Sequence, residues 1–366
     1  MAEPGPTVLV TADTVGGVWT YTRVLVDRLV AADVEVVVAA MGGEPSESSA
    51  RWFSATDGVE LYAADYDLEW MPDPWDDVEA AGDWLMAICR HTDPDLIHLN
   101  NFAHGTLNWA RPVLMVGHSC VLSWFRAVED RAAPPRFDTY RRRVEAGLQA
   151  ADVVASPTRA MLSALQRHYG PFAKTRVVYN GLAPEPFESR PAEPFVLTAG
   201  RLWDAAKNVG AVRRIARELS WPVFVAGRQQ APDGRRVSLE GIEPLGHLDH
   251  DELLDWYARA GIYALPARYE PFGLTPLEAG LSGCALVLGD IASLREVWGE
   301  AALFVDPDAP GELAEAIETL IGDGDLRREM GRRAARRARR YGADQMGQRY
   351  LELYRQLDAS PRPDSP

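Results

Sequence analysis

Two carboxylates, Glu270 and Glu278, lie eight positions apart around the run Glu-Pro-Phe-Gly-Leu-Thr-Pro-Leu-Glu. The apolar segment 261–266 just before them predicts a buried strand, and the second carboxylate falls in the first turn of a predicted helix. A strand followed by a glycine loop and a helix start presents backbone N–H groups to an anion. Carboxylates accept hydrogen bonds from sugar hydroxyls. The run therefore suits a nucleotide-sugar, which has hydroxyls at both ends and a diphosphate between them.

Glu278 also has a purely structural interpretation. The segment Thr275-Pro276-Leu277-Glu278 has the spacing of a capping box, with proline at the first helical position. In that case the carboxylate accepts from the Thr275 N–H group and binds no ligand. The residue types alone leave both roles open.

A second candidate is the segment Gly200-Arg201-Leu-Trp-Asp-Ala-Ala-Lys207-Asn208, which follows the predicted strand 195–199. Residues at the carboxyl end of such a strand face the crevice in which α/β proteins bind ligands. A guanidinium grips phosphate oxygens bidentately, and an ammonium adds a point charge. Cations near a helix start oppose the helix dipole. We therefore expect an anion to compensate Arg201 and Lys207, which argues against the alternative that they are ordinary surface residues.

A third candidate is Asp13-Thr-Val-Gly16-Gly17-Val18, which joins the first predicted strand to the first predicted helix. Two glycines let the backbone approach a ligand, and the helix start supplies unpaired N–H groups. A simple tight turn explains the same residues.

Two histidines, His98 and His118, end two successive predicted strands. A single histidine at a strand end is usually a satisfied polar group. Two at equivalent ends could both face the ligand crevice.

Short apolar runs separated by helical segments position these residues. The predicted strands are 7–12, 34–40, 59–64, 96–99, 112–117, 153–155, 176–179, 195–199, 223–226, 261–266, 285–288 and 303–305. Continuous apolar runs of this length are typical of parallel strands buried on both faces, and alternation with helices indicates right-handed βαβ units. The proline-rich segment 180–194 breaks the pattern. We therefore expect an α/β protein with two doubly wound halves.

The bulk composition limits the class of protein further. The chain has 366 residues, 47% of them hydrophobic and 25% charged, with a formal net charge of −15. This length favours two domains, and the acidic balance argues against nucleic acid as a partner. The 3 cysteines are widely spaced without a metal-ligand pattern. No signal peptide or membrane-spanning run is recognised, so we expect a cytoplasmic protein.

Four further runs each have a functional and a structural interpretation. Asp65–Trp84 could hold a sugar acceptor on its tryptophans, or form a loop and a helix that buries them. The arginine-rich runs 327–340 and 141–143 could touch a membrane, although solvated helix faces are the favoured interpretation. Asp306-Pro-Asp308 has a metal-binding spacing, but we favour a turn and expect no metal and no cofactor.

Taken together, these motifs resemble the retaining glycosyltransferases of family four, which have the GT-B fold of two Rossmann-like domains facing a central cleft. The resemblance covers almost the whole chain in the right order. The motifs that carry it are Gly16-Gly17, Asp-Leu-Ile-His98, the strand ending at His118, Tyr179-Asn180-Gly181, Gly200-Arg201 with Lys207, Ala226-Gly227-Arg228 and the run from Glu270 to Glu278. The last motif, two glutamates separated by seven residues with Phe-Gly-Leu inside, is the hallmark of that family.

The resemblance implies a role for each matching residue. Arg201 and Lys207 would bind the donor diphosphate with the Gly16-Gly17 turn, and Glu278 would accept the ribose hydroxyls. The donor sugar and phosphate would be held by Glu270 together with the amides of Phe272, Gly273 and Leu274. The remaining assignments are His118 beside the reacting sugar and Arg228 near the base or phosphate. The family usually places its lysine five residues after the arginine, whereas the gap here is six.

The domain organisation implied by the resemblance divides the chain into five parts. These are an acceptor domain at 1–182, a linker at 183–194, a donor-binding domain at 195–340, a helix crossing back to the first domain at 341–357 and a disordered tail at 358–366.

The implied reaction is the metal-independent transfer of a hexosyl group, with retention, from a nucleotide diphosphate sugar to an unidentified acceptor. The alternatives are another enzyme on this fold, such as a nucleotide-sugar epimerase or a phosphorylase, and a non-catalytic nucleotide-sugar binding module. A phosphorylase would be expected to hold pyridoxal phosphate on a lysine. The chain has only Lys174 and Lys207, and the second is already assigned to the diphosphate.

Overall fold

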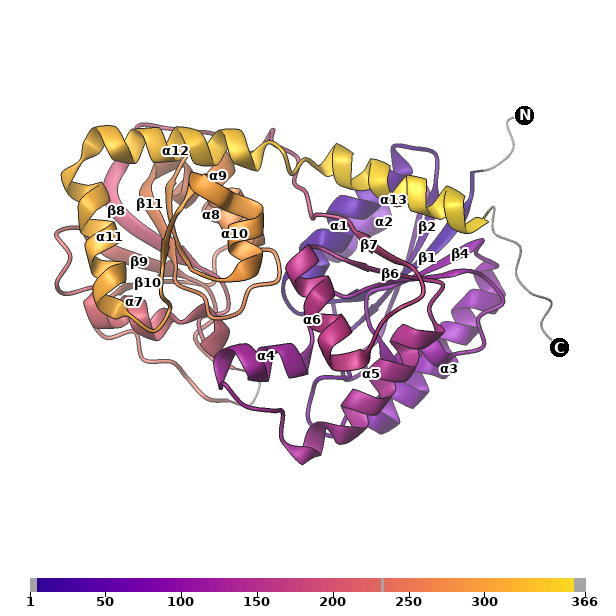
Figure 1. Ribbon diagram of the computed structural model, residues 1–366. Coiled ribbons are helices and arrows are strands. Elements are labelled where there is room, and N and C mark those ends of the chain that lie inside the picture. Colours follow the sequence, from indigo (N-terminus) through magenta and orange to yellow (C-terminus); the bar gives the residue numbers. More distant parts are fainter. Residues whose placement is uncertain (1–4, 232–233, 359–366) are drawn as a thin grey trace. The chain divides into compact units, whose positions relative to one another are not determined.

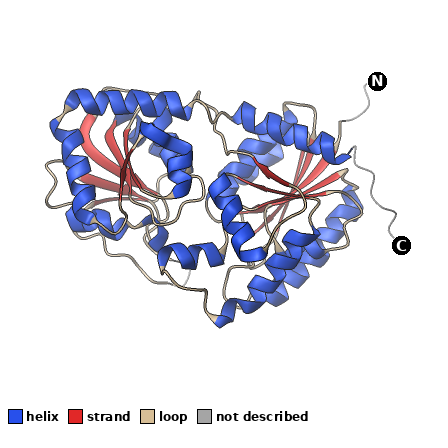
Figure 2. Cartoon of the chain, viewed as in Figure 1, coloured by secondary structure: helices blue, strands red, loops and turns tan. Residues whose placement is uncertain are grey.

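The computed structural model describes residues 5–231 and 234–358, and the chain divides into two compact units. Unit 1 comprises the chain up to Ser123, Arg131–Gly181 and the chain from Ala343, and unit 2 comprises Trp124–Asp130 and Leu182–Gly342. Each unit is a parallel sheet covered by helices (Figures 1 and 2). Of the tail predicted to be disordered, Asp358 ends a helix and the rest lies outside the described residues.

The sheet of unit 1 has the order β3-β2-β1-β4-β5-β6-β7, with every neighbouring pair parallel. Its strands are β1 (Thr7–Asp13), β2 (Glu35–Met41), β3 (Val59–Ala63), β4 (Leu96–Leu99), β5 (Val113–Val116), β6 (Val153–Ser156) and β7 (Thr175–Val177). All were predicted, with ends that differ by at most two residues. The central strands β1, β4, β5 and β6 bury nearly all their side chains, as a sheet covered on both faces requires.

The helices of unit 1 connect these strands. They are α1 (Gly17–Val30), α2 (Glu47–Ala55), α3 (Trp75–Thr92), α5 (Asp138–Ala150), α6 (Arg159–Tyr169) and α13 (Ala343–Asp358), with 3-10 turns η1 (Ala103–Thr106) and η2 (Pro135–Phe137). Helix α4 (Val121–Val128) begins in unit 1, and its part from Trp124 clusters with unit 2.

The C-terminal helix α13 belongs to the core of unit 1. It lies beside α1 (Figure 1) and adds Met346, Tyr350, Leu353, Tyr354 and Leu357 to the apolar cluster under the sheet. The first unit is therefore built from both ends of the chain.

The sheet of unit 2 has the order β10-β9-β8-β11-β12-β13, again with parallel neighbours. Its strands are β8 (Glu193–Ala199), β9 (Val223–Ala226), β10 (Glu243–Gly246), β11 (Ala260–Leu265), β12 (Ala285–Gly289) and β13 (Leu303–Val305). All but β10 were predicted. That strand carries Glu243 and Pro244 and no apolar run, which an edge position tolerates.

The helices of unit 2 are α7 (Val209–Ile215), α8 (His250–Arg259), α9 (Leu274–Leu281), α10 (Ala292–Trp298), α11 (Pro310–Gly322) and α12 (Gly324–Ala338), with 3-10 turns η3 (Ala205–Lys207) and η4 (Gly299–Ala301). Unit 2 has a second, separate apolar core, to which α7, α11 and α12 contribute among its helices.

Candidate active site

Several of the predicted site residues lie at the point in each sheet where the strand order reverses, whereas His118 follows β5 and Arg228 follows β9. In unit 2 this point lies between β8 and β11, and the loops that follow these strands carry Arg201, Lys207 and Glu270. In unit 1 it lies between β1 and β4, and the loop after β1 carries Gly16. Ligands of doubly wound sheets bind at the carboxyl ends of strands beside such a reversal.

Arg201 is held by a buried carboxylate. Its Nη2 donates to Asp204 Oδ2 at 3.0 Å, while 41% of the arginine side chain remains exposed. The other oxygen of Asp204 accepts from the Ala206 amide at 3.0 Å and from the Trp124 indole at 3.1 Å. These bonds fix the carboxylate, so the guanidinium it orients is a preorganised, partly solvated cation suited to an anionic ligand.

Lys207 forms an ion pair with Glu270, which joins the loop after β8 to the loop after β11. The two side chains are 15% and 11% exposed. The next residue, Asn208, adopts a left-handed conformation (φ 55°) that ends η3 and begins α7. Its Nδ2 donates to the Pro266 carbonyl at 3.0 Å, and its Oδ1 accepts from Arg268 at 2.7 Å. Asn208 and Arg268 therefore tie the two loops together, and neither was singled out from the sequence.

Gly227 explains how the loop after β8 lies so close to the loop after β9. Its φ is +140°, and a Cβ atom there would lie 1.8 Å from the Gly200 carbonyl oxygen. Only glycine permits this backbone contact directly before Arg201. Arg228 follows at the end of β9 with an exposed side chain.

The loop from Glu270 to Glu278 buries its aromatic side chain and leads into α9. Phe272 is buried and packs edge-on against Tyr341, with ring centroids 5.7 Å apart. Gly273 (φ +94°) is the N-cap of α9, and Leu274 is its first residue. The amides of these three residues stand at the positive end of the α9 dipole.

The capping-box interpretation of Thr275 is wrong. Helix α9 begins at Leu274, two residues before the start that this interpretation requires, and no side chain caps it. Pro276 is therefore its third residue, not its first. The Thr275 hydroxyl instead lies 2.8 Å from the Tyr263 hydroxyl, which donates to the Ala199 carbonyl at 3.2 Å. A glycine cap requires no side chain, which leaves the Glu278 carboxylate without a capping role.

Glu278 is a buried carboxyl group with 6% of its surface exposed. Burial raises its pKa to about 7, and the neighbouring Tyr257 hydroxyl offsets part of that effect. Near neutral pH this group exchanges its proton readily, and hydrogen-bond donors from a ligand would favour its ionised form.

In unit 1, the glycine turn after β1 leads directly into α1. Gly16 (φ +91°) is the N-cap and Gly17 the first helical residue, with no side chain capping the helix. The Asp13 carboxylate accepts from the Val15 amide at 2.6 Å. The turn thus presents the first amides of α1, as an anion-binding turn requires.

His118 and His98 have different environments. The Nε2 atom of His118 lies 2.8 Å from Asn100 Oδ1, and its ring is half-buried. His98 is completely buried between Tyr354 (2.6 Å) and Tyr21 (3.2 Å). His98 is thus a structural residue that secures α13, and the expectation that both histidines face a ligand is wrong for it. Asn100 was not predicted as a site residue. Its position directly after β4 is the sequence signal that could have identified it.

The remaining runs have protein partners of their own. In the Asp and Trp stretch, Trp84 packs against Tyr66 and Trp75 lies under Arg143, and both tryptophans are half-buried. Asp308 pairs with Arg268 at 2.6 Å within a turn closed by Asp306. Across residues 5–231 and 234–358, no group of three His, Cys, Asp or Glu side chains could hold a metal ion.

The arginine run 327–340 largely coincides with α12. Glu329 pairs there with Arg332, Arg333 and Arg336, and Arg327 and Arg337 donate to backbone carbonyls. Among the helices that the structure describes, none is long and apolar enough to cross a membrane.

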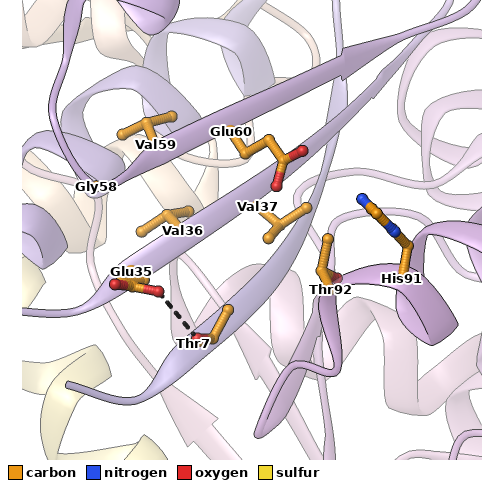
Figure 3. Close-up of a pocket in the computed structure, with 9 residues that line it drawn as sticks. All are labelled: Thr7, Glu35, Val36, Val37, Gly58, Val59, Glu60, His91 and Thr92. Atoms are coloured by element: carbon orange, nitrogen blue, oxygen red, sulfur yellow. Dashed lines mark hydrogen bonds between the residues drawn. The ribbon is translucent and has the colours of Figure 1, made fainter. Parts of the chain in front are cut away.

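A shallow pocket of about 340 Å³ opens at the other end of the unit 1 sheet (Figure 3). It is lined by Thr7, Glu35, Val36, Val37, Gly58, Val59, Glu60, His91 and Thr92. Most of these residues lie where β1, β2 and β3 begin, and His91 and Thr92 end α3, whereas ligands of this architecture bind where strands end. The pocket is therefore separate from the candidate site.

Two family models match consecutive parts of the chain. Residues 15–186 match Glycosyltransferase Family 4, and residues 193–323 match Glycosyl transferases group 1. Among curated relatives, glycogen synthase of Mycobacterium tuberculosis is 31% identical over 211 residues, covering 52% of this chain and 50% of the relative. D-inositol 3-phosphate glycosyltransferase of Corynebacterium urealyticum is 34% identical over 113 residues, covering 30% and 27%. The matches thus span half or less of these relatives.

The fold agrees with solved structures over almost the whole chain. Sucrose-phosphate synthase from Thermosynechococcus elongatus superimposes with a TM-score of 0.83 at 20% identity, covering 97% of this chain and 99% of that one. HepE from Anabaena, solved in complex with UDP-glucose, gives a TM-score of 0.74 at 16% identity, covering 96% and 100%. The predicted GT-B type of fold, with two Rossmann-like domains, is confirmed.

Proposed function

Because this chain belongs to glycosyltransferase family four, we propose that it moves a hexosyl group from a nucleoside diphosphate sugar to an acceptor hydroxyl, with retention of anomeric configuration. The observation that carries this proposal is the unit 2 cluster, which we define as Arg201, Lys207, Glu270 and Glu278. Two cations and two carboxylates lie there around the carboxyl ends of β8 and β11 and the start of α9.

The donor class is inferred from the chemistry of this cluster. An exposed guanidinium, an ammonium and a helix start can together hold a diphosphate, and carboxylates can accept hydrogen bonds from hydroxyls on either side of it. HepE, which has the same fold, was solved in complex with UDP-glucose. A second structure with this fold, described as trehalose-6-phosphate from Escherichia coli, was solved with UDP-2-fluoro glucose. We therefore choose UDP-glucose as the first donor to test.

Within unit 2, a bound diphosphate would compete with Glu270 for the Lys207 ammonium. Glu270 could then accept hydrogen bonds from the donor sugar, while Arg201 and the amides of Phe272, Gly273 and Leu274 hold phosphate oxygens. Preorganised donors of this kind stabilise charge on a leaving diphosphate, and we propose that they do so without a metal ion. Arg228 would lie near the base or the phosphate.

On unit 1, we propose that Gly16, Gly17 and His118 act in the same reaction. The first amides of α1 are suited to a phosphate oxygen, and the His118 ring to a sugar hydroxyl. The leaving phosphate oxygen would deprotonate the acceptor on the face from which it departs. This pathway needs no covalent intermediate on the protein.

The four charged residues of the unit 2 cluster favour turnover over a non-catalytic binding module. A module that only senses a nucleotide-sugar has no need of two cations and two carboxylates around one diphosphate. An epimerase remains the second enzyme to test, because it would consume the same donor.

The experiment is a turnover assay with UDP-glucose, GDP-mannose and ADP-glucose, with and without a panel of sugar and sugar-phosphate acceptors and with and without chelator. We expect nucleoside diphosphate release with one donor, unaffected by chelator, and a product whose anomeric configuration by proton NMR equals that of the donor. Inverted product would contradict retention. An altered nucleotide-sugar without release would indicate an epimerase, and binding without any reaction a sensor.

A further inference from the structure

The side chain of Asn100 is fixed in one orientation by Thr11. Its Nδ2 donates to the Thr11 carbonyl at 2.7 Å, and its backbone N–H donates to the Thr11 hydroxyl at 2.8 Å. A carbonyl oxygen can only accept, so the amide nitrogen must face Thr11. The amide oxygen of Asn100 must therefore face His118.

This orientation determines which nitrogen of His118 carries the proton. Asn100 Oδ1 lies 2.8 Å from His118 Nε2, and an amide oxygen cannot donate. Nε2 must therefore be the N–H donor. A neutral imidazole has one N–H group, so Nδ1 is left as an unprotonated acceptor. Within the described parts of the chain, no protein group hydrogen-bonds this second nitrogen.

The surroundings of His118 keep its ring neutral and in place. Tyr21 packs against the ring edge to face, with centroids 4.4 Å apart, and the Tyr21 hydroxyl is in turn bound to His98. Burial lowers the pKa of His118 to about 3, and it also lowers the pKa of His98. Burial raises the pKa of the Tyr21 hydroxyl, so all three groups are uncharged at neutral pH.

We propose that Asn100 is a positioning residue that holds His118 in the Nε2–H tautomer, so that Nδ1 accepts a hydrogen bond from a sugar hydroxyl of the substrate. This inference rests on the proposed function. The Nε2–H tautomer excludes a phosphate oxygen as the partner of Nδ1, because two acceptors cannot form a hydrogen bond. The hydroxyl can come from the donor sugar or from a sugar acceptor, and binding measurements separate these sources.

The first test is independent of activity. Long-range proton–nitrogen correlation NMR on the full chain, with its 7 histidines labelled, reports the protonated nitrogen of each ring, and a His118→Gln spectrum assigns the His118 signals. We expect the Nε2–H tautomer in the ligand-free protein at pH 7. A Nδ1–H tautomer or an averaged ring would overturn the inference, whether or not the proposed function holds.

The second test replaces the amide oxygen by a charge. In Asn100→Asp, the carboxylate should raise the pKa of His118, so that at lower pH both ring nitrogens become donors and the acceptor is lost. We expect normal behaviour at high pH and a loss of about three- to tenfold at low pH, the size of one hydrogen bond. Asn100→Ala is the matched control, because its loss should not depend on pH.

A carboxylate shifts a neighbouring pKa by about 1–3 units, so the low-pH measurement must lie near pH 5 for a ring whose pKa starts at about 3. The readout compares UDP-glucose with UDP by calorimetry at pH 5 and pH 8, together with UDP release in the presence of acceptors. Weaker binding of UDP-glucose but not of UDP at pH 5 would identify the donor sugar as the source. Unchanged binding with slower transfer at pH 5 would identify the acceptor. A loss in Asn100→Asp that is the same at both pH values would overturn the positioning role. If UDP and UDP-glucose both fail to bind the wild-type protein, the UDP-glucose form of the proposed function fails, and the NMR result alone decides this inference.

Discussion

The Lys207 ammonium and the Glu270 carboxylate form an ion pair that is largely buried in unit 2, with 15% and 11% of the two side chains exposed. The pair joins the loops that follow β8 and β11, the two strands at which the order of the sheet reverses. Each charge compensates the other before a substrate binds. A diphosphate would replace Glu270 as the anion that compensates Lys207. The ion pair should therefore contribute to stability, and Lys207 to turnover, and variants can separate these two effects.

Removal of Lys207 should harm both stability and turnover. In Lys207→Met, Glu270 is left as an uncompensated carboxylate, and breaking a buried pair in this way costs up to about 3–5 kcal/mol of stability. Loss of a cation at the leaving group should cost about 2.7–4 kcal/mol in transition-state stabilisation, by analogy with oxyanion-hole donors. Chemical denaturation and donor turnover measure the two effects.

The double variant Lys207→Met with Glu270→Gln separates these effects. Because it removes both charges, we expect its free energy of unfolding to recover toward that of the wild type, while turnover stays low. Recovery of turnover together with stability would show that the pair is structural and would contradict a phosphate-binding role for Lys207.

Glu278 should make the stability of the protein decrease as pH rises. Its pKa is raised by burial from 4.5 to about 7, so between these values the folded state keeps a proton that the unfolded state has lost. The free energy of unfolding should then fall by up to about 1.4 kcal/mol per pH unit in that window. Glu278→Gln should flatten this part of the curve in denaturant titrations from pH 4 to pH 8.

Glu69 is the matched control for Glu278. It is also buried, it accepts from the amides of Phe102 and Ala103 in unit 1, and its pKa is likewise raised to about 7 by burial. Glu69→Gln should also change the pH dependence of stability but leave nucleotide affinity unchanged. A loss of nucleotide affinity in Glu69→Gln equal to that in Glu278→Gln would argue against a specific ribose contact.

Nucleotide binding should release a proton from Glu278 at pH 6.5. Ribose hydroxyls donate to the ionised carboxylate, so binding favours deprotonation of a group whose pKa is about 7. Calorimetry in two buffers of different ionisation enthalpy measures this release. We expect it in the wild type and not in Glu278→Gln, and identical proton release in both proteins would contradict the assignment.

The bond between His98 and Tyr354 should stabilise unit 1 without affecting the nucleotide site. Tyr354→Phe removes a 2.6 Å hydrogen bond in a buried environment, with an expected loss of about 1–3 kcal/mol. The matched variant is Tyr350→Phe on the same helix, because the Tyr350 hydroxyl is also buried but is not one of the two hydroxyls bound to His98. Thermal melting should fall in the first variant only. Equal effects in both would show that packing, not the hydrogen bond, secures α13.

Gly227→Ala should displace the loop after β8, which carries Arg201. The new Cβ would lie 1.8 Å from the Gly200 carbonyl oxygen, and the residue has a φ of +140°, so the backbone before Arg201 must move. Gly246→Ala is the control, since it also has a positive φ of +74° but meets nothing within 4 Å. We expect both variants to lose stability and only Gly227→Ala to lose nucleoside diphosphate affinity. Equal affinity in the two variants would contradict this role of Gly227.

The central elements of both sheets could be predicted because their strands are buried on both faces. Strands such as β5 and β9 are continuous apolar runs, which, in alternation with helices, are typical of a parallel sheet between helix layers. Strand β10 could not be predicted, because an edge strand that contains proline has no such pattern.

Residues of the candidate site could be singled out from the sequence where a residue type has few uses, and less so where the geometry decides. Arg201 and Lys207 lie in the segment between β8 and α7, and cations before a helix start call for an anion. The start of α9 was misplaced because Thr275 and Pro276 also fit a capping box, and only the left-handed conformation of Gly273 shows the true N-cap. The contact between Asn100 and His118 joins two strand ends that are 18 residues apart, which no local pattern reveals.

The most direct test of nucleotide-sugar binding in unit 2 is a thermal-shift titration of the wild type, Arg201→Ala and Arg217→Ala with uridine, guanosine and adenosine diphosphates and their sugars. Arg217 is the matched arginine of the same unit, 71% exposed and paired with Glu240. A ligand that binds only the folded state raises the melting midpoint by mass action. We predict a rise with at least one nucleotide, unaffected by chelator, in the wild type and Arg217→Ala but not in Arg201→Ala. No rise with any nucleotide, or an equal rise in Arg201→Ala, would contradict nucleotide-sugar binding by the unit 2 cluster.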